Sequence, residues 1–279
     1  MPNTLPSPHI GPKEGARFRV HHMREHKQAG VPFTMLTAYD ALSARIFDEA
    51  GIDMLLVGDS YGTTMLGYET TIPVTMSDML HATRAVTRVV KRAFVVADLP
   101  FGAYGSSVSQ AIDNAVELMK AGANGVKAEG GAAIAETVKA IVDIGIPVVG
   151  HLGFTPQSEN ALGGKRIQGR GTDATQRLVD DARALHDAGV CAITLEMVPS
   201  SATQAVMAAV DTPIIGIGAG KECDGQVLVW TDMAGMTDWV PSFVNRFGEV
   251  GQALAHAASD YRDAVRARTF PAEGHFHKT

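Results

Sequence analysis

Short apolar runs alternate with segments of helical spacing along most of the chain. At four places a helical segment stops at a glycine, and a few residues later an apolar run ends on a polar side chain. The glycines are Gly51, Gly122, Gly145 and Gly189. Directly after a helix, glycine takes the left-handed backbone that ends helices without a Cβ penalty. The pattern therefore predicts a repeated unit of helix, glycine cap and strand.

Apolar runs of this kind predict seven or eight strands. They cover residues 33–37, 54–59, 94–98, 126–129, 148–151, 192–196, 213–218 and, with a weaker pattern, 226–230. Strands that are apolar on both faces and separated by helices are typical of a parallel sheet covered by helices. Eight such units in about 250 residues fit a (β/α)8 barrel, and no Pro/Ser-rich linker divides the chain. We predict an α/β fold, a single (β/α)8 TIM barrel domain spanning residues 1–279.

The two ends of the chain lack the repeated unit. We expect an N-terminal extension over residues 1–25 and a long closing helical region over residues 241–268. Residues 270–279 have no pattern for burial, so we expect a loose tail there. His22 and His26 lie four residues apart in a predicted helix. Since nothing completes a ligand set around them, we expect a solvated helix face there and not a metal site.

Composition narrows the possible partners. The chain has 24 basic and 30 acidic residues and a formal net charge of -6, so no global positive field attracts phosphate backbones or anionic lipid. We expect neither nucleic acid nor membrane partners. Cys191 and Cys223 are too few for a disulfide framework or a thiolate metal site. With no leader pattern and no apolar run of about 18 residues, a cytoplasmic location is expected.

Polar residues close several of the predicted strands, namely Asp59, Asp98, Glu129, His151 and Glu196. In a parallel barrel the active site lies at the C-terminal ends of the strands. Side-chain alternation predicts these shared faces: Leu55, Val57 and Asp59; Phe94, Val96 and Asp98; Lys127 and Glu129; Ala192, Thr194 and Glu196. If these faces point inward, the polar residues converge at the barrel mouth.

Four carboxylates crowded at one mouth repel one another and require a positive charge among them. Lys127 is one candidate, and a hard divalent cation such as Mg²⁺, which prefers oxygen ligands, is the other. The absence of clustered cysteines and of inward histidine pairs argues against zinc. Each acid taken singly has an alternative role, as an exposed strand-end cap or as the partner of a helix lysine.

Two glycine-rich segments invite a ligand-binding interpretation. Residues 216–221 come too late for a dinucleotide fingerprint and lack the phosphate-loop spacing, which leaves a loop that approaches a ligand or a tight turn. Residues 153–172 form a long connection rich in glycine and basic residues. Such connections are usually lids or binding loops, so we expect contact with an anionic substrate or cofactor, with an oligomer contact as the alternative.

In the segments that carry the polar strand ends and the glycine-rich loops, the sequence resembles the ketopantoate hydroxymethyltransferases. The matching motifs lie at residues 36–40, 56–60, 97–101, 126–131, 150–157, 168–171 and 215–220. Their number and order make the resemblance specific. It fades before Arg17, between Asp232 and Pro241, and in the tail, where nothing is carried over.

The resemblance implies a (β/α)8 barrel, a homo-oligomer that is usually a decamer, and one Mg²⁺ per subunit. It implies metal binding by Asp59 and Asp98 and, often through water, by Glu129; binding of the 2-oxoacid by Asp59, Ser60, Asp98 and Lys127; a supporting role for His151 at the substrate pocket; and Glu196 as the proton acceptor. One departure is Ala128, where some relatives carry a larger apolar residue. Its side chain is expected to face away from the mouth.

The implied reaction transfers a hydroxymethyl group from 5,10-methylenetetrahydrofolate, a co-substrate, to 3-methyl-2-oxobutanoate. The product, 2-dehydropantoate, leads to pantothenate and coenzyme A. The nearest alternative is a Mg-dependent lyase or mutase of the phosphoenolpyruvate mutase and isocitrate lyase group, whose Lys-Lys-Cys-Gly-His loop has no counterpart here. An assembly scaffold without chemistry is a further alternative, but it would not require so many polar strand ends.

Overall fold

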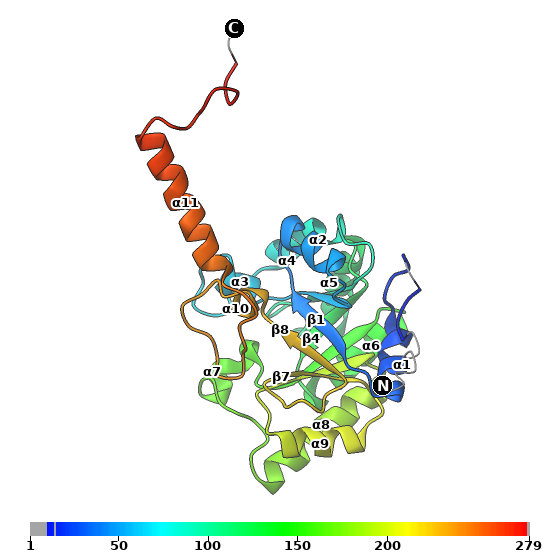
Figure 1. Cartoon of the computed structure of the whole chain (residues 1–279). Helices are drawn as coiled ribbons and strands as arrows, with labels where there is room; N and C mark the ends of the chain where they lie inside the picture. The colour runs from blue at the N-terminus through cyan, green and yellow to red at the C-terminus, as the bar shows by residue number, and fades with distance from the viewer. Residues whose placement is uncertain (1–9, 14, 278–279) are drawn as a thin grey trace, which may run out of the picture. The chain divides into compact units, whose positions relative to one another are not determined.

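The computed structural model describes residues 10–13 and 15–277, which form two compact units, one ending at Leu228 and the other beginning at Val229. The first unit holds a closed barrel of eight parallel strands, ordered β1 to β8 around the barrel (Figure 1). The strands are β1 (Phe33–Thr37), β2 (Met54–Val57), β3 (Phe94–Asp98), β4 (Gly125–Glu129), β5 (Val148–Gly153), β6 (Ala192–Glu196), β7 (Ile214–Ile217) and β8 (Gly225–Leu228).

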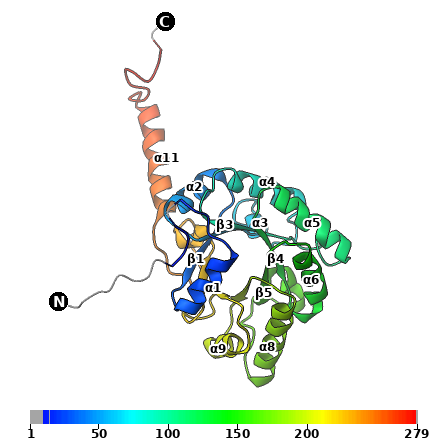
Figure 2. The same cartoon turned by 90° about the vertical axis from the view of Figure 1, so that its right-hand side faces the viewer.

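Along the chain, at least one helix follows each of the strands β1 to β6, and these helices surround the barrel (Figure 2), whereas β7 leads to β8 without a helix. The helices of this unit are α1 (Val20–Ala29), α2 (Ala41–Glu49), α3 (Tyr61–Thr64), α4 (Met76–Thr87), α5 (Val108–Lys120), α6 (Ala135–Asp143), α7 (Glu159–Leu162), α8 (Thr172–Asp187) and α9 (Ser200–Ala209). Their buried faces carry residues such as Leu118 of α5 and Leu185 of α8, both fully buried. The (β/α)8 barrel fold is thus confirmed, including the weakly patterned eighth strand.

The four glycines that end helical segments have the backbone that the sequence predicts. Their φ angles are 89° for Gly51, 103° for Gly122, 90° for Gly145 and 89° for Gly189. In each case the glycine N–H donates to the carbonyl three residues earlier, which closes the last turn of the helix. A side chain at these positions would be strained, so glycine sets where each helix stops and the next strand starts.

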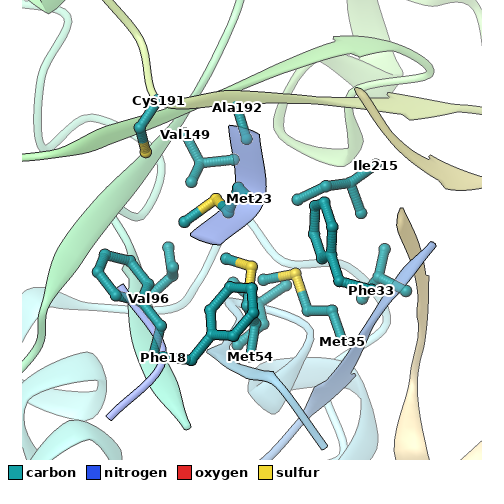
Figure 3. Packing of buried hydrophobic residues seen from close by; sticks show 13 residues of the cluster. Phe18, Met23, Phe33, Met35, Met54, Val96, Val149, Cys191, Ala192 and Ile215 are labelled. Atoms are coloured by element: carbon teal, nitrogen blue, oxygen red, sulfur yellow. The ribbon is translucent and has the colours of Figure 1, made fainter. Parts of the chain in front are cut away.

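The interior of the barrel is apolar at the N-terminal ends of the strands (Figure 3). The strands contribute Phe33, Met35, Met54, Leu56, Phe94, Val96, Val149, Ala192, Ile215 and Val227 to this cluster. Phe18 and Met23 precede β1 and are also fully buried in it. The predicted N-terminal extension, residues 1–25, therefore contains residues that close the bottom of the barrel, while residues 1–9 lie outside the described residues.

The expectation of a solvated face for His22 and His26 is wrong. Both side chains are buried, and both rings pack against Phe18, with centroids 5.3 Å and 5.7 Å from its ring. Nδ1 of His22 accepts a hydrogen bond from the backbone N–H of Arg19, and Nδ1 of His26 lies 2.8 Å from the carbonyl of Val31. Burial lowers the pKa of His22, since it disfavours the charged ring. These histidines are satisfied polar groups of the barrel floor.

One strand presents the opposite face to the one predicted. In β2 the barrel cluster contains Met54 and Leu56, so Leu55 and Val57 face the surrounding helices. Asp59 nevertheless reaches the mouth, because the chain leaves strand geometry after Val57 and Asp59 lies in a turn. The predicted position of Asp59 at the mouth is therefore correct, but the turn after Val57, and not side-chain alternation along β2, places it there.

The second unit contains two helices among its described residues, α10 (Trp230–Met233) and α11 (Val250–Arg266). The predicted closing helical region, residues 241–268, is thus helical only from Val250. Along α11 the apolar residues Val250, Leu254, Tyr261 and Val265 are all exposed. Residues 270–277 are exposed and form no helix or strand, and residues 278–279 lie outside the described residues. No helix in the described part of the chain has the length and apolarity needed to cross a membrane.

Replacing Phe18 with alanine tests its place in the barrel. Because Phe18 is fully buried in the core cluster, Phe18→Ala should lower the free energy of unfolding by about 3–5 kcal/mol through lost burial and a residual cavity. The matched control is Leu42→Ala, at a side chain that is 73% exposed, which should change it by less than about 0.5 kcal/mol. Urea unfolding of both variants measures this. Equal, small losses would show that residue 18 lies outside the barrel core.

Candidate active site

The C-terminal ends of β2 to β6 bring the predicted site residues together. The parallel register places Asp98 of β3 opposite Lys127 of β4, and Glu129 of β4 opposite His151 of β5. These four side chains and Asp59 are all buried. The side chain of Glu196, at the end of β6, keeps 18% of its surface exposed. A buried charged cluster thus lies beside one carboxylate that solvent can reach.

Lys127 is the positive centre of the cluster. Its Nζ lies 2.8 Å from Oδ1 of Asp98 and 3.9 Å from Oε1 of Glu129. Ala128, between Lys127 and Glu129 in the strand, is buried on the opposite face, away from the mouth. Burial alone would lower the pKa of Lys127, but the carboxylates of Asp98, Glu129 and Asp59 outweigh it and raise this pKa. The lysine therefore stays charged in its buried position.

His151 connects the buried cluster to Glu196. Its Nδ1 lies 3.1 Å from Oε1 of Glu129, and its Nε2 lies 3.3 Å from Oε2 of Glu196. Burial and Lys127 lower the pKa of His151, but Glu129 and Glu196 raise it overall, to about 9. The close approach of β5 to β6 requires Gly153, because a Cβ there would overlap the carbonyl oxygen of Glu196. The imidazole is thus held between two carboxylates.

The main chain of Asp59 is hydrogen-bonded to the side chain of Asp98. The backbone N–H of Asp59 donates to Oδ2 of Asp98 over 3.0 Å. Ser60 follows in the same turn, and its Oγ lies 2.7 Å from the hydroxyl oxygen of Tyr39. The turn after β2 therefore places a carboxylate, a hydroxyl and the Asp98 side chain next to one another.

Two residues that the sequence did not single out complete the cluster. The side-chain amide of Gln157 donates to Oδ2 of Asp59 over 2.8 Å, and its backbone N–H donates to Oε2 of Glu129 over 2.9 Å. The hydroxyl of Tyr104 donates to Oε1 of Gln157 over 2.7 Å. Gln157 ends one of the matched motifs, but a loop glutamine carries no charge or periodicity to distinguish it. Tyr104 lies outside those motifs.

The cluster carries more negative charge than its cations balance. Burial raises the pKa of Asp59 to about 8, and the charges of Asp98 and Glu129 contribute in the same direction. Burial also raises the pKa of Asp98. For Glu129, burial opposes ionisation, yet its hydrogen bond and charge interaction with His151 lower its pKa overall. Asp59 is therefore the carboxylate whose ionisation an added cation would favour most.

A divalent cation fits the donor set around Asp59 and Asp98. Both residues offer the hard oxygen ligands that Mg²⁺ prefers, and Oδ1 of Asp98 is paired with the ammonium of Lys127. Among residues 10–13 and 15–277, no three His, Cys, Asp or Glu side chains form a ready ligand group. Mg²⁺ is usually held by only one or two carboxylates, with water or substrate oxygens completing its shell. The oxygens of Glu129 have His151 Nδ1 and the backbone N–H of Gln157 as partners, which is compatible with its predicted ligand role through water.

The two glycine-rich segments differ in their secondary structure. Residues 153–172 include a turn of 3-10 helix at Pro156–Ser158 and the short α7, so this connection is less irregular than expected. Lys165, Arg166 and Arg170 are exposed on it. A cavity of about 240 Å³, lined in part by Gly153 and Gln168, lies beside it. Residues 218–224 form the bends and the turn between β7 and β8.

Comparison with known proteins gives a family and a fold. The family model described as ketopantoate hydroxymethyltransferase matches residues 17–273. A 3-methyl-2-oxobutanoate hydroxymethyltransferase of Saccharopolyspora erythraea is 54% identical over 93% of this chain and 89% of its own. A protein of the same name from Thermobifida fusca is 48% identical over 99% of both chains.

Among solved structures, a phosphonopyruvate hydrolase in complex with oxalate and Mg²⁺ has a TM-score of 0.61 and 14% identity, over 93% of this chain and 92% of its own. A 2,3-dimethylmalate lyase has a TM-score of 0.57 and 16% identity, over 93% and 92%. At this identity these structures support the barrel fold alone. The family model and the close relatives cover nearly the whole chain, and the chain therefore belongs to the ketopantoate hydroxymethyltransferase family.

Proposed function

We propose that this chain transfers a hydroxymethyl group from 5,10-methylenetetrahydrofolate to 3-methyl-2-oxobutanoate, giving 2-dehydropantoate for the synthesis of pantothenate and coenzyme A. The observation that carries the proposal is the position of Glu196. It is a partly exposed carboxylate beside a cluster whose other charged groups are buried. A base next to a buried positive charge suits proton removal adjacent to a carbonyl group.

The buried cluster is suited to an anionic 2-oxoacid. The ammonium of Lys127 balances negative charge on the substrate oxygens, and Ser60 offers a hydroxyl hydrogen bond in the turn that also carries Asp59. Mg²⁺ held by Asp59 and Asp98, with Glu129 behind water, would supply Lewis-acid stabilisation of the keto oxygen when bound. The raised pKa of Asp59 supports a cation at this position, because burial and the charges of Asp98 and Glu129 disfavour its ionisation and a bound cation would offset them.

Glu196 then accepts the proton from C3 of the oxoacid. Nε2 of His151 lies against Oε2 of Glu196, so His151 orients this carboxylate and leaves its other oxygen for the proton. Glu129 in turn holds Nδ1 of His151. The resulting enolate forms a carbon–carbon bond to the one-carbon unit of the folate. Water supplies the hydroxyl oxygen of the new hydroxymethyl group as the bonds from this carbon to the folate nitrogens break, and tetrahydrofolate leaves. These two contacts support an orienting role for His151, which is more specific than the supporting role that the sequence implied.

The shared fold keeps the lyase or mutase alternative in view, but nothing in the site favours it over transfer. The close relatives carry the transferase name, whereas the lyase and hydrolase structures are only 14–16% identical. The homo-oligomer, the cytoplasmic location and the absence of nucleic acid and membrane partners stay predictions. The exposed apolar residues of α11 support the homo-oligomer, since such stripes often mark protein contacts.

The proton-transfer step predicts Mg²⁺-dependent exchange of the C3 proton of 3-methyl-2-oxobutanoate in D₂O, followed by NMR. Glu196→Gln should slow this exchange about 10²–10⁴-fold, because the amide cannot accept the proton, and should leave Mg²⁺ binding largely intact. The control Glu117→Gln removes an exposed carboxylate of α5 and should exchange as the wild type does. Equal loss of exchange and of Mg²⁺ binding in Glu196→Gln would make Glu196 a ligand and not the base.

Cation binding should depend on pH through Asp59. With a pKa of about 8, Asp59 is mostly protonated at pH 7 in the cation-free protein and must ionise when the cation binds. We expect release of about one proton per Mg²⁺ bound at pH 7 and less at pH 9. Because the raised pKa favours the protonated folded state, cation-free stability should fall between about pH 4 and pH 8.

Titration calorimetry of Mg²⁺ binding in buffers of different ionisation enthalpy measures the released protons. Thermal unfolding without and with Mg²⁺ measures the second effect, and stabilisation by Mg²⁺ should grow from pH 6.5 to pH 8.5. A binding enthalpy that is the same in every buffer at pH 7 would contradict a protonated Asp59.

The basic connection predicts a role in binding the anionic substrates. The double variant Lys165→Ala with Arg166→Ala should raise the KM for the folate or the oxoacid more than it lowers kcat, since both side chains are exposed on the connection that follows β5. The control Lys120→Ala with Arg183→Ala removes exposed basic residues of α5 and α8. Unchanged KM values, with an altered oligomeric state by light scattering, would favour the oligomer contact.

A further inference from the structure

We infer that Gln157, itself fixed by Tyr104, is the positioning residue that holds Asp59 and Glu129 in the arrangement that binds a divalent cation. The inference rests on the proposed function, because it concerns the cation site of that reaction. Gln157 is buried, with 5% of its surface exposed, and lies in the 3-10 turn that follows β5. No charge or periodicity in the sequence marks it.

Gln157 has one amide orientation that satisfies its neighbours. Nε2 donates to Oδ2 of Asp59 over 2.8 Å and to the carbonyl of Leu99 over 2.9 Å. The carbonyl of Leu99 can only accept, so a flipped amide would bring Oε1 against this oxygen and would lose both donations from Nε2. Oε1 instead accepts from the Tyr104 hydroxyl over 2.7 Å. The three contacts together lock the side chain.

The backbone of the same residue holds the other carboxylate. The N–H of Gln157 donates to Oε2 of Glu129, while Nδ1 of His151 lies against Oε1. Asp59 lies 98 residues before Gln157 in the chain, and Glu129 lies 28 residues before it. Gln157 therefore joins the ends of three strands at one point. A neutral donor suits this place, because it satisfies Asp59 without adding a charge.

Tyr104, in the loop after β3, fixes the position of Gln157 relative to Glu129. Its hydroxyl accepts from the backbone N–H of Glu129 and lies 3.1 Å from the carbonyl of the same residue. The side chain is buried, and burial raises its pKa, so the hydroxyl stays a neutral donor. Orienting groups of this kind, when removed, typically weaken metal binding about 10–100-fold.

The experiment compares Gln157→Met, Tyr104→Phe and the double variant in the full chain. Methionine keeps much of the volume of glutamine but donates no amide hydrogen. Titration calorimetry with Mn²⁺ measures affinity, and urea unfolding measures stability. We expect a rise of about tenfold or more in the Mn²⁺ Kd for Gln157→Met and a smaller rise for Tyr104→Phe. The rise in the double variant should be smaller than the product of the two single rises, because Tyr104 acts on Asp59 through the Gln157 amide.

The controls are Gln176→Met, whose exposed amide donates to Asp180, and Tyr261→Phe in α11. Neither should change the Mn²⁺ Kd. A Kd within about twofold of the wild-type value in a folded Gln157→Met protein would overturn the inference. Additive effects of the two substitutions would overturn the link through Tyr104. If Gln157→Met does not fold, Tyr104→Phe, which retains Gln157, still tests the link.

Exchange of the C3 proton separates this inference from the proposed function. Normal Mg²⁺-dependent exchange in the wild type, with an unchanged Mn²⁺ Kd in Gln157→Met, would overturn the inference alone. Mn²⁺ binding that depends on Gln157, without any exchange in the wild type, would overturn the proposed function alone. A wild-type protein that binds no Mn²⁺ would contradict both.

Discussion

The excess of buried carboxylates around Lys127 is the constraint on which the site depends. Asp59, Asp98 and Glu129 are all buried within reach of one lysine and one histidine. Burying an unpaired ion costs several kcal/mol, so the arrangement persists only if each charge is paired, hydrogen-bonded or neutralised by a proton. The raised pKa of Asp59 is the remaining imbalance. That imbalance favours a cation at the mouth, and the proposed cation would in turn attract an anionic oxoacid.

The barrel divides these tasks between its two ends. At the N-terminal ends of the strands, Phe18 and Met23 complete an apolar cluster that contains no charge. At the C-terminal ends, strand pairing fixes Asp98 opposite Lys127 and Glu129 opposite His151. Stability and chemistry are therefore built from opposite ends of the same strands. The contacts of Gln157 then add a connection between loops that strand pairing alone does not supply.

Much of this follows from the sequence, because glycine caps and side-chain alternation are local rules. They predicted all eight strands and the convergence of Asp98, Lys127 and Glu196. These local rules failed for residues whose position depends on tertiary contacts or on turn geometry. His22 and His26 are polar residues buried by Phe18, a tertiary contact, and Asp59 reaches the mouth through a turn. The role of Gln157 depends on partners up to 98 residues away and had no sequence signal beyond its motif.

In the proposed mechanism, Glu196 faces C3 of an oxoacid held at the buried cluster. A crystal structure of the protein with 3-methyl-2-oxobutanoate and Mg²⁺ tests it most directly. We expect C3 within about 3–3.5 Å of a Glu196 carboxylate oxygen, with the keto and carboxylate oxygens directed to the cation beside Asp59 and Asp98 and to Lys127. An oxoacid bound elsewhere, or bound at the cluster with C3 turned away from Glu196, would contradict it.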